Sequence, residues 1–439
     1  MKLTPLDLGI GRFLEFSFTL VYPEVYAEED LKVAARALLA KYPLLGSRVN
    51  FLRSELRPRE GVNIFQSRHI DGSLSDFADL SSSTRTDDNV KSLGKLFAFA
   101  KGLWQSLRQP VILIRAVFLN DATVIRFITQ HPLCDASGSF AIAQAYCAIL
   151  NGVEPPDLAF DRPSLKLKDA FTQTTNDNQP YPPPGPSVLD RLRSMFRWSL
   201  RSFNNKGGQQ SLRDIFHPSD KRVDHTFHVP SEKMRVWREN AREHGFNVTE
   251  NDLLTAFIHQ ATYQPNTVQD FSLILGIRRE LENDMPMHNS CFLIPIDMAS
   301  AQSQSKDTSA SLNDIAAEVR RAIVESRHPH MLTQLLEYYS KPTIRPMMPQ
   351  WYGRRAPQSV VTSWTHLPFF KLEIQGTKPS FFNGELDMWE FLKKFGVAMD
   401  DCSITWKADA GERPGYCIRG RLHRDAWRRM EEMLDQMEM

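Results

Sequence analysis

Residues 130–138 read Gln-His-Pro-Leu-Cys-Asp-Ala-Ser-Gly, and the segments on either side decide how this stretch lies in the fold. Two apolar runs rich in β-branched residues precede it, at 111–119 and 122–129. The dipeptide between them, Asn120-Asp121, is a short turn signal. The pattern predicts a β-hairpin whose second strand ends at His131.

The same stretch also opens a helix. Ser137 or Ser139 can cap it, apolar residues recur at helical spacing over 140–150, and Asn151-Gly152 ends it. We therefore expect His131 where a strand ends just before a helix N-terminus. Ligand crevices and catalytic bases often lie at such places.

The spacing of His131 and Asp135 suits two separate tasks. A histidine at a strand end can be held rigidly and can reach into a cleft as a general base. An aspartate four residues later has left the strand and can turn back to hold the loop. The simpler interpretation is a loop histidine followed by a helix-capping aspartate. Cys134 between them could be a nucleophile, although such a residue is more often a small apolar side chain that packs.

The composition argues against several classes of protein. The 439 residues are 42% hydrophobic and include 27 Phe, enough to fill large cores. Lys plus Arg number 53 and Asp plus Glu 52, a balance that argues against a chain that binds nucleic acid or a membrane surface along its length. The five cysteines are scattered without a Cys-x-x-Cys pair, so we expect a reduced intracellular protein with no metal site.

The chain carries no recognisable targeting signal. Residues 1–7 lack the apolar core of a signal peptide, and no run of about 18 apolar residues could form a transmembrane helix. Residues 437–439 match no peroxisomal or lipidation signal. We therefore expect a cytoplasmic protein with no membrane partner, and the mixed charges are compatible with a monomer.

Strand-like and helix-like segments alternate in both halves of the chain, which predicts an α/β fold. Residues 172–187 interrupt this alternation because they are rich in Pro, Asn, Gln and Thr, and a basic amphipathic helix is expected next, at 189–201. We therefore expect an N-terminal domain at 1–171, a crossover linker at 172–215 and a C-terminal domain at 216–439.

Several dispersed segments resemble the motifs of one enzyme family. Residues 131–135 match its His-x-x-x-Asp motif, and residues 249–252, Thr-Glu-Asn-Asp, resemble its Ser/Thr-x-Asn-Asp helix start. The other segments, in chain order, are Tyr42–Arg48 (Tyr-Pro-x-x-x-Gly-Arg in the family), Arg278, His288-Asn289 (Gly-Asn in the family), Val360–Trp364 and Lys378-Pro379. On these residues the chain resembles the BAHD acyltransferases, and more closely their fungal branch of trichothecene acetyltransferases.

The resemblance implies a fold and a site. The fold would be two chloramphenicol-acetyltransferase-like domains with a long crossover and a channel between them, and His131 would lie midway along the channel as the catalytic base. Asp135 would orient the loop by pairing with Arg278, with Arg279 as the rival partner. The remaining supporting residues would be Gly138, which stands two positions after the family's usual glycine, and Ser363 and Trp364, which would line the site and could supply an oxyanion donor.

The resemblance also implies the reactants. Acyl-CoA would be a co-substrate, and no bound cofactor would be needed. The acceptor would be a hydroxyl or amine of an apolar secondary metabolite, such as a terpenoid or polyketide. The partners would then be small molecules only.

One segment departs from the family pattern. Where the family has Asp-Phe-Gly-Trp-Gly, residues 373–377 read Glu-Ile-Gln-Gly-Thr. This departure leaves open a cyclase or isomerase of the same fold that uses His131 without CoA. A non-catalytic binding protein, with His131 and Asp135 in structural roles, is a third alternative.

Overall fold

The computed structural model describes most of the two halves of the chain. The described residues are 1–4, 6–7, 14–50, 53–80, 86–97, 109–160, 167–169, 222–262, 271–281, 287–296, 298, 311–340, 359–388, 401–408 and 414–436. The crossover expected at 172–215 and the helix expected at 189–201 lie outside these ranges.

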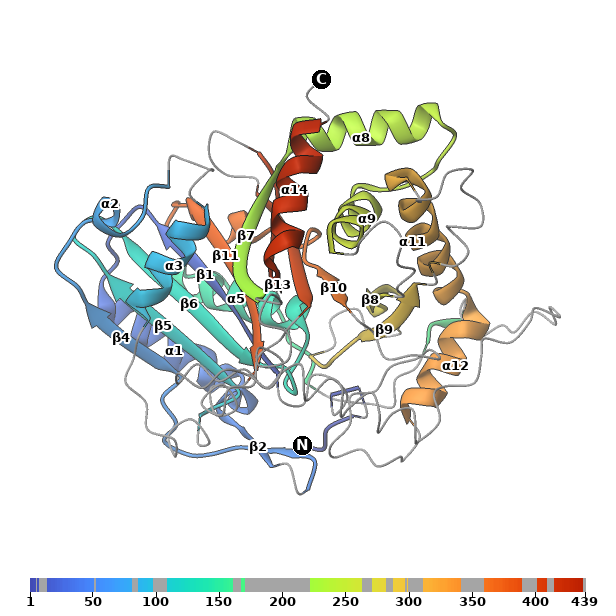
Figure 1. Ribbon diagram of the computed structural model, residues 1–439. Helices are drawn as coiled ribbons and strands as arrows, with labels where there is room; N and C mark the ends of the chain where they lie inside the picture. Colours follow the sequence, from blue (N-terminus) through green and yellow to red (C-terminus); the bar gives the residue numbers. More distant parts are fainter. Residues whose placement is uncertain are drawn as a thin grey trace, which may run out of the picture.

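One sheet contains five strands in the order β11-β1-β6-β5-β4 (Figure 1). The strands are β1 (Leu14–Tyr22), β4 (Phe65–His69), β5 (Ile112–Phe118), β6 (Thr123–Gln130) and β11 (Phe381–Met388). The hairpin expected from the sequence is confirmed, because β5 and β6 pair antiparallel with Phe118 opposite Thr123. β1 pairs with β6 so that Glu15 lies opposite Gln130, which brings the start of β1 beside the end of β6.

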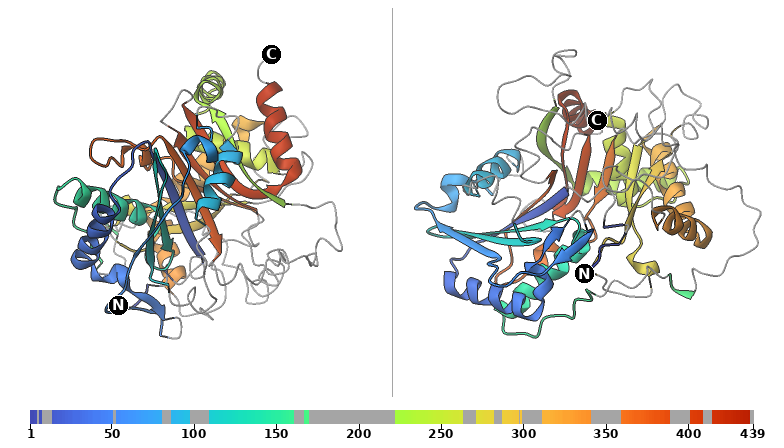
Figure 2. Two further views of the ribbon diagram at one scale, coloured as in Figure 1. Left: turned by 90° about the vertical axis from the view of Figure 1, so that its left-hand side faces the viewer. Right: turned by 90° about the horizontal axis from the view of Figure 1, so that it is seen from below.

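Helices cover both faces of this sheet, as Figure 2 shows in the view from below. α1 (Glu28–Lys41) and α5 (Ala136–Leu150) pack on one face, in a core that includes Phe18, Phe127 and Tyr146. α3 (Thr86–Leu96) packs on the other face, where Leu93 joins a cluster with Val117.

The other sheet contains six strands in the order β7-β13-β12-β10-β8-β9. The strands are β7 (Arg222–Pro230), β8 (Phe271–Gly276), β9 (Cys291–Ile296), β10 (Val360–Ser363), β12 (Cys402–Ala408) and β13 (Gly415–His423). The helices of this half are α8 (Ser231–Glu243), α9 (Glu250–Thr262), α11 (Leu312–Ser326), α12 (Pro329–Ser340) and α14 (Arg424–Gln436). α9 lies at the centre of this half, and its buried Leu253 and Phe257 share a core with Ile294 of β9 and Ile418 of β13.

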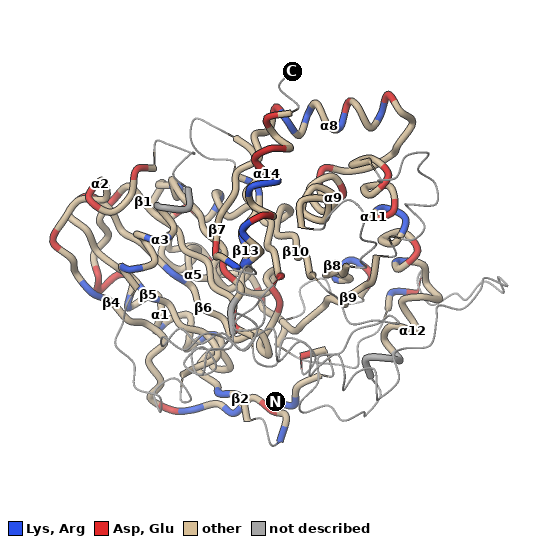
Figure 3. The backbone as a smooth tube through the Cα atoms, in the orientation of Figure 1, with Lys and Arg blue, Asp and Glu red and all other residues tan. Residues whose placement is uncertain are grey.

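Shorter elements complete the described parts. They are the two-stranded sheet β2 (Arg48–Asn50) and β3 (Glu55–Arg57), the helix α2 (Leu74–Phe77) and the 3-10 turns Pro43–Gly46, Arg278–Glu280 and Phe369–Lys371. None of the helices in the described ranges is both long and apolar enough to cross a membrane. Figure 3 shows basic and acidic residues interspersed along α8, α11 and α14, in keeping with the near-zero net charge.

The two halves of the chain share the five-stranded sheet. β11 comes late in the chain, yet it pairs antiparallel with β1, with Leu20 opposite Phe382. Glu385 of β11 then accepts hydrogen bonds from Arg126 of β6 and from Arg419 of β13. The domain boundaries at 171 and 216 remain a prediction, and β11 is the place where the C-terminal half enters the N-terminal sheet.

The segment that departs from the family pattern is docked on the N-terminal half. Tyr22 donates to the carbonyl of Leu372 at 2.7 Å and Tyr26 to that of Ile374 at 3.1 Å. The Asn151 side chain donates to the carbonyl of Glu373 and accepts from the amide of Gln375, at 2.9 and 2.6 Å. These bonds hold a tight turn in which Gln375 and Gly376 both have positive φ, 48° and 86°.

Candidate active site

His131 directly follows the last residue of β6, and its backbone is fixed on both sides. Its N–H donates to the carbonyl of Leu14 at 2.9 Å, and its own carbonyl accepts from Nδ2 of Asn289 at 2.9 Å. Its ring packs edge-on against Phe16, with the ring centroids 5.3 Å apart. The side chain is half-buried, so part of it stays accessible while its peptide unit is held.

The surroundings favour a neutral imidazole. Burial lowers the pKa of His131 below its ordinary value, whereas the Asp135 carboxylate, the residue's own carbonyl, Asn289 and Asp7 act in the opposite direction. Burial prevails, so the ring is unprotonated at neutral pH. A neutral imidazole can accept a proton, as a general base requires.

Asp135 is held by three donors. Its Oδ1 accepts from the amide of Gly138 at 3.0 Å and from Nη2 of Arg278 at 2.7 Å, and its Oδ2 accepts from the amide of Ser290 at 3.0 Å. Burial alone would raise the pKa of Asp135, but the Arg278 guanidinium and the two amide donors outweigh it and bring the pKa below the ordinary value. Asp135 is therefore an ionised, fully engaged carboxylate.

The cap of α5 is the aspartate of the simpler interpretation and not one of the two serines. Neither Ser137 nor Ser139 caps α5; Asp135 is the N-cap, with an extended backbone (φ −81°, ψ −177°) and its carboxylate on the amide of Gly138. Ser139 instead shares a hydrogen bond of 2.7 Å with the hydroxyl of Thr129 on β6. An aspartate that leaves the strand in extended conformation can reach the free amides of the first turn, so it displaces the serines that follow.

Arg278 and Arg279 both follow β8, in the turn Arg278–Glu280. Between the two candidates, Arg278 is the residue that bonds Asp135, and both side chains of this pair are largely buried, at 18% and 13% exposure. The pair joins the start of α5 in the N-terminal half to the end of β8 in the C-terminal half.

Asp7 and Asn289 complete the network around His131. Asp7 is fully buried, and its Oδ1 accepts from both the amide and the Nδ2 of Asn289, each at 3.0 Å. The Asn289 side chain in turn reaches the carbonyl of His131. His288 beside it bonds the Asn289 carbonyl through Nδ1 at 3.0 Å. His288 and Asn289 carried a sequence signal, because they stand where the family has Gly-Asn, whereas Asp7 carried none.

Gly138 is required by close packing. A Cβ at this position would lie 2.5 Å from Cβ and 2.9 Å from Sγ of Cys134, closer than real Cβ atoms approach. Cys134 is fully buried beneath the first turn of α5. Gly138 therefore allows the loop after β6 to lie against the helix that it starts.

Trp364 lies near His131 through a shared neighbour. Its side chain is 4% exposed, and its ring meets Phe16 edge-on with the centroids 5.9 Å apart, while Phe16 also contacts His131. Ser363, at the end of β10, shares a hydrogen bond of 2.8 Å with the Thr365 hydroxyl. The structure thus brings Trp364, which follows the strand ending at Ser363, and His131 against the same Phe16 ring.

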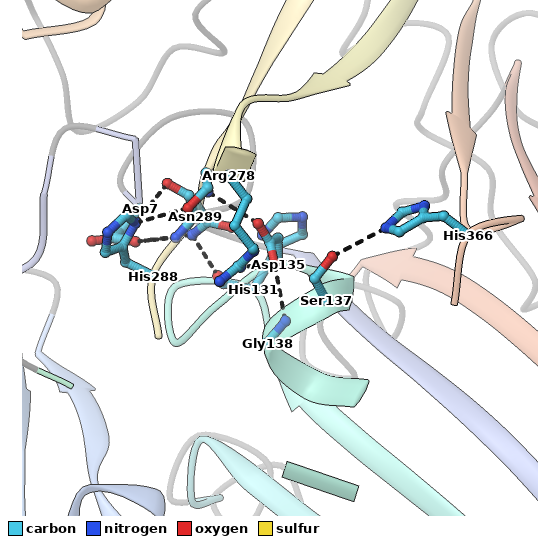
Figure 4. Close-up of polar contacts among 10 residues, drawn as sticks. Asp7, His131, Asp135, Ser137, Gly138, Arg278, His288, Asn289 and His366 are labelled. Carbon is cyan, nitrogen blue, oxygen red and sulfur yellow. Dashed lines mark hydrogen bonds and ion pairs between the residues drawn. The ribbon is translucent and has the colours of Figure 1, made fainter. Parts of the chain in front are cut away.

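A second histidine reaches the start of α5. Nε2 of His366 lies 3.3 Å from the hydroxyl of Ser137. Figure 4 shows this pair on one side of Asp135, with Asp7, His288 and Asn289 on the other side. The sequence offered no reason to select His366.

Other kinds of site find little support. Among the described residues, no group of three or more His, Cys, Asp or Glu side chains could hold a metal ion. A cavity of about 350 Å³ is lined by Lys41–Leu44 and Asp157–Phe160, and neither His131 nor Asp135 lines it. The polar groups around His131 are therefore the strongest candidate for chemistry in the described parts of the chain.

No protein-family model matches the chain. A curated relative, the acetyltransferase peniE of Penicillium patulum, is 22% identical over 403 residues, which cover 81% of this chain and 82% of the relative. F. sporotrichioides TRI101, solved in complex with coenzyme A and T-2, has a TM-score of 0.64 at 12% identity and matches 98% of this chain and 96% of its own. Vinorine synthase has a TM-score of 0.59 at 16% identity, with 97% and 90% covered.

These similarities establish the fold. Both solved structures match nearly the whole of this chain, so the expected α/β fold is confirmed. The resemblance to the BAHD acyltransferases, which was based on short motifs, is confirmed at the level of the fold.

Proposed function

We propose that the protein is an acyl-CoA-dependent acyltransferase that moves an acyl group to a hydroxyl or amine of an apolar secondary metabolite. The single observation that carries the proposal is that His131 and Asp135 have different roles in the structure. Asp135 has its carboxylate occupied by Arg278 and two amides, while His131 is held at a strand end as a neutral base.

The reaction needs one base and no covalent enzyme intermediate. His131 takes the proton of the acceptor hydroxyl as its oxygen attacks the thioester carbonyl of acyl-CoA. The tetrahedral intermediate then collapses, the C–S bond breaks, and the thiolate of CoA takes the proton back from the imidazolium. General-base catalysis of this kind contributes about 10²–10⁴ in rate.

Asp135 supports this step by holding the loop rather than by moving a proton. Its oxygens receive three donors at 2.7–3.0 Å, so its carboxylate is committed to Arg278, Gly138 and Ser290. Cys134 needs no chemical role, because it is fully buried in the core beneath α5.

The tetrahedral oxyanion requires a hydrogen-bond donor, worth about 3 kcal/mol. The strand that ends at Ser363 is the candidate source, because Trp364 and His131 both pack against the ring of Phe16. A side chain or amide at Ser363 or Trp364 would supply the donor.

The reactants follow from the names of the similar proteins. The curated relative is an acetyltransferase, and TRI101 was solved with coenzyme A and T-2. We take acyl-CoA as co-substrate and a small apolar acceptor, with no resident cofactor or metal, and we place the protein in the cytoplasm as a monomer without a nucleic-acid or membrane partner. Two domains, 1–171 and 216–439, would flank a channel in which His131 meets both substrates.

The test is thiol release from acetyl-CoA with a panel of hydroxylated terpenoids and polyketides, together with calorimetry of CoA binding. His131→Ala should abolish turnover and leave CoA binding and melting temperature unchanged. His244→Ala, which removes an exposed histidine at the end of α8, is the matched control. Wild-type turnover by His131→Ala would end the proposal. A wild-type chain that binds no CoA but converts a hydrophobic metabolite to a product of equal mass would instead favour the cyclase or isomerase.

A further inference from the structure

Asp7 is a buried charge that the proposed chemistry does not use. It is fully buried, and donors from two distant segments reach its carboxylate. Oδ2 accepts from the amide and the hydroxyl of Thr4, both at 2.6 Å, and Oδ1 accepts from the amide and Nδ2 of Asn289, both at 3.0 Å. One oxygen thus anchors the N-terminal segment, and the other holds a segment 282 residues away.

These contacts fix the orientation of the Asn289 side chain. Nδ2 lies 3.0 Å from the Asp7 carboxylate and 2.9 Å from the carbonyl of His131. Both groups only accept hydrogen bonds, so the amide nitrogen and not the amide oxygen must face them. Asp7 therefore determines which way the Asn289 amide is turned.

The same amide holds the peptide unit of His131. Asn289 Nδ2 donates to the His131 carbonyl, while the neighbouring Ser290 amide donates to Asp135. Asn289 and Ser290 thus hold the His-x-x-x-Asp loop by hydrogen bonds at both His131 and Asp135. Asp7 orients the amide that bonds His131. Arg278 reinforces the other contact, because it also bonds Asp135.

We propose that Asp7, acting through Asn289, is a positioning residue that keeps the backbone of His131 where its imidazole can accept the proton of the acceptor. The inference rests on the proposed function, in which His131 is the base. Asp7 touches neither the imidazole's reacting nitrogen nor a substrate in this role. A bond to a charged acceptor is stronger than one to a neutral acceptor, so the carboxylate holds the amide more firmly than an uncharged side chain could.

The charges around His131 also give the role a distinctive readout. The Asp135 and Asp7 carboxylates raise the pKa of His131 against the effect of burial. Other titratable groups near this loop are Arg278 and Arg279, from the turn after β8, His288, beside Asn289, and His366, beside Ser137. Loss of the Asp7 charge alone should lower the His131 pKa further.

The experiment compares Asp7→Asn with the wild-type full chain. Asp7→Asn keeps the shape but removes the charge and one acceptor. We expect kcat to fall about 10–100-fold with KM nearly unchanged, because a small displacement of a catalytic group costs this much. The acid limb of the kcat/KM profile should move to lower pH. Asn289→Ala should reduce kcat similarly, and the double variant should be no slower than the worse single variant.

Thr4→Val is the matched control, because it removes a bond to the other oxygen of Asp7. If Asp7 serves only to anchor the N-terminal segment, Thr4→Val and Asp7→Asn would both lower the melting temperature and leave kcat and the pH profile as in the wild type. That result would overturn the inference. Additive losses in the double variant would overturn it as well, since the two residues would then act independently.

A measurement without turnover separates this inference from the proposed function. NMR titration of the histidine side chains, with the His131 signal identified by its loss in His131→Gln, reports the imidazole directly. A lower midpoint in Asp7→Asn than in Thr4→Val and wild type supports the link, even if no acceptor reacts. An unchanged midpoint refutes it, whatever the outcome of the acyl-transfer assay.

Discussion

Arg278 and Asp135 lie 143 residues apart in the sequence, and their side chains meet at 2.7 Å between Nη2 and Oδ1. The carboxylate belongs to the N-cap residue of α5 and the guanidinium to the turn after β8. The pair therefore ties the loop that presents His131 to the six-stranded sheet. Because both side chains are largely buried, loss of one partner leaves the other charge without its counterion.

Arg278→Met should destabilise the fold by about 3–5 kcal/mol, the usual cost when one partner of a buried ion pair is removed. Activity should fall together with stability, because the loop that presents His131 loses the hydrogen bond between Arg278 and Asp135. Chemical denaturation followed by fluorescence measures the first effect. Arg279→Met is the matched control on the neighbouring residue, and an equal loss of stability in the control would show that the Asp135 contact is not the cause.

The ion pair between Asp135 and Arg278 should also make the free energy of unfolding depend on pH in the acid range. The pKa of Asp135 is lowered in the fold, so its contribution to stability is complete above the pKa of an unfolded aspartate and is lost as pH falls through the folded value. Asp135→Asn should reduce stability at neutral pH and flatten this acid-side decline. Denaturation curves at several pH values between neutral and about pH 3 measure the slope. A slope as steep as that of the wild type would assign the decline to other carboxylates.

The pH dependence of turnover should reflect the environment of His131. Burial lowers its pKa, so the base remains neutral in the range where a free imidazole, with a pKa of about 6.5, already takes up a proton. We expect kcat/KM to stay level down through that range and to fall only at lower pH. A profile that turns down above the ordinary imidazole pKa would mean that a different group, or a protonated His131, limits the reaction.

The sequence predicted the local parts of this site because they depend on neighbouring residues. Residue patterns placed the β5–β6 hairpin and the helix that follows it, and the order of motifs singled out His131, Asp135 and Arg278. It could not reveal Asp7, whose contacts with Asn289 span 282 residues and leave no local pattern. The same holds for β11, which joins β1 across most of the chain. Capping propensity alone does not rank Asp135 against the two serines, so the sequence left both interpretations of the cap open.

Gly138→Ala should destabilise the protein by about 1–3 kcal/mol, the usual cost of overpacking a core. The added Cβ would lie 2.5 Å from Cβ of Cys134, which is backbone-linked and cannot rotate away. Thermal melting measures the loss. Gly94→Ala, in helix α3, is the matched control because a Cβ there meets nothing within 4 Å. The control should be neutral or stabilising by about 0.5–1 kcal/mol, since alanine favours a helix over glycine. Equal behaviour of the two variants would show that the Cys134 contact is relieved at little cost.

Glu385 offers a test of how the two sheets are joined. It stands on β11, accepts from Arg126 of β6, and accepts from Nη2 of Arg419 on β13 at 2.9 Å. All three side chains are at most 23% exposed. Glu385→Gln keeps the volume but leaves two neighbouring guanidinium groups without their shared carboxylate. We expect a loss of about 3–5 kcal/mol.

The loss of stability in Glu385→Gln should come from the contact between the two sheets rather than from either sheet alone. Hydrogen exchange would then show faster exchange at β11 and at β6 and β13, the strands that carry Arg126 and Arg419. Glu154→Gln is a suitable control, because Glu154 is paired with Lys41 at the surface, with 84% of its side chain exposed. An exposed pair contributes at most about 1 kcal/mol. If Glu385→Gln were as mild as this control, the shared strand β11, and not the ion pairs, would hold the two halves together.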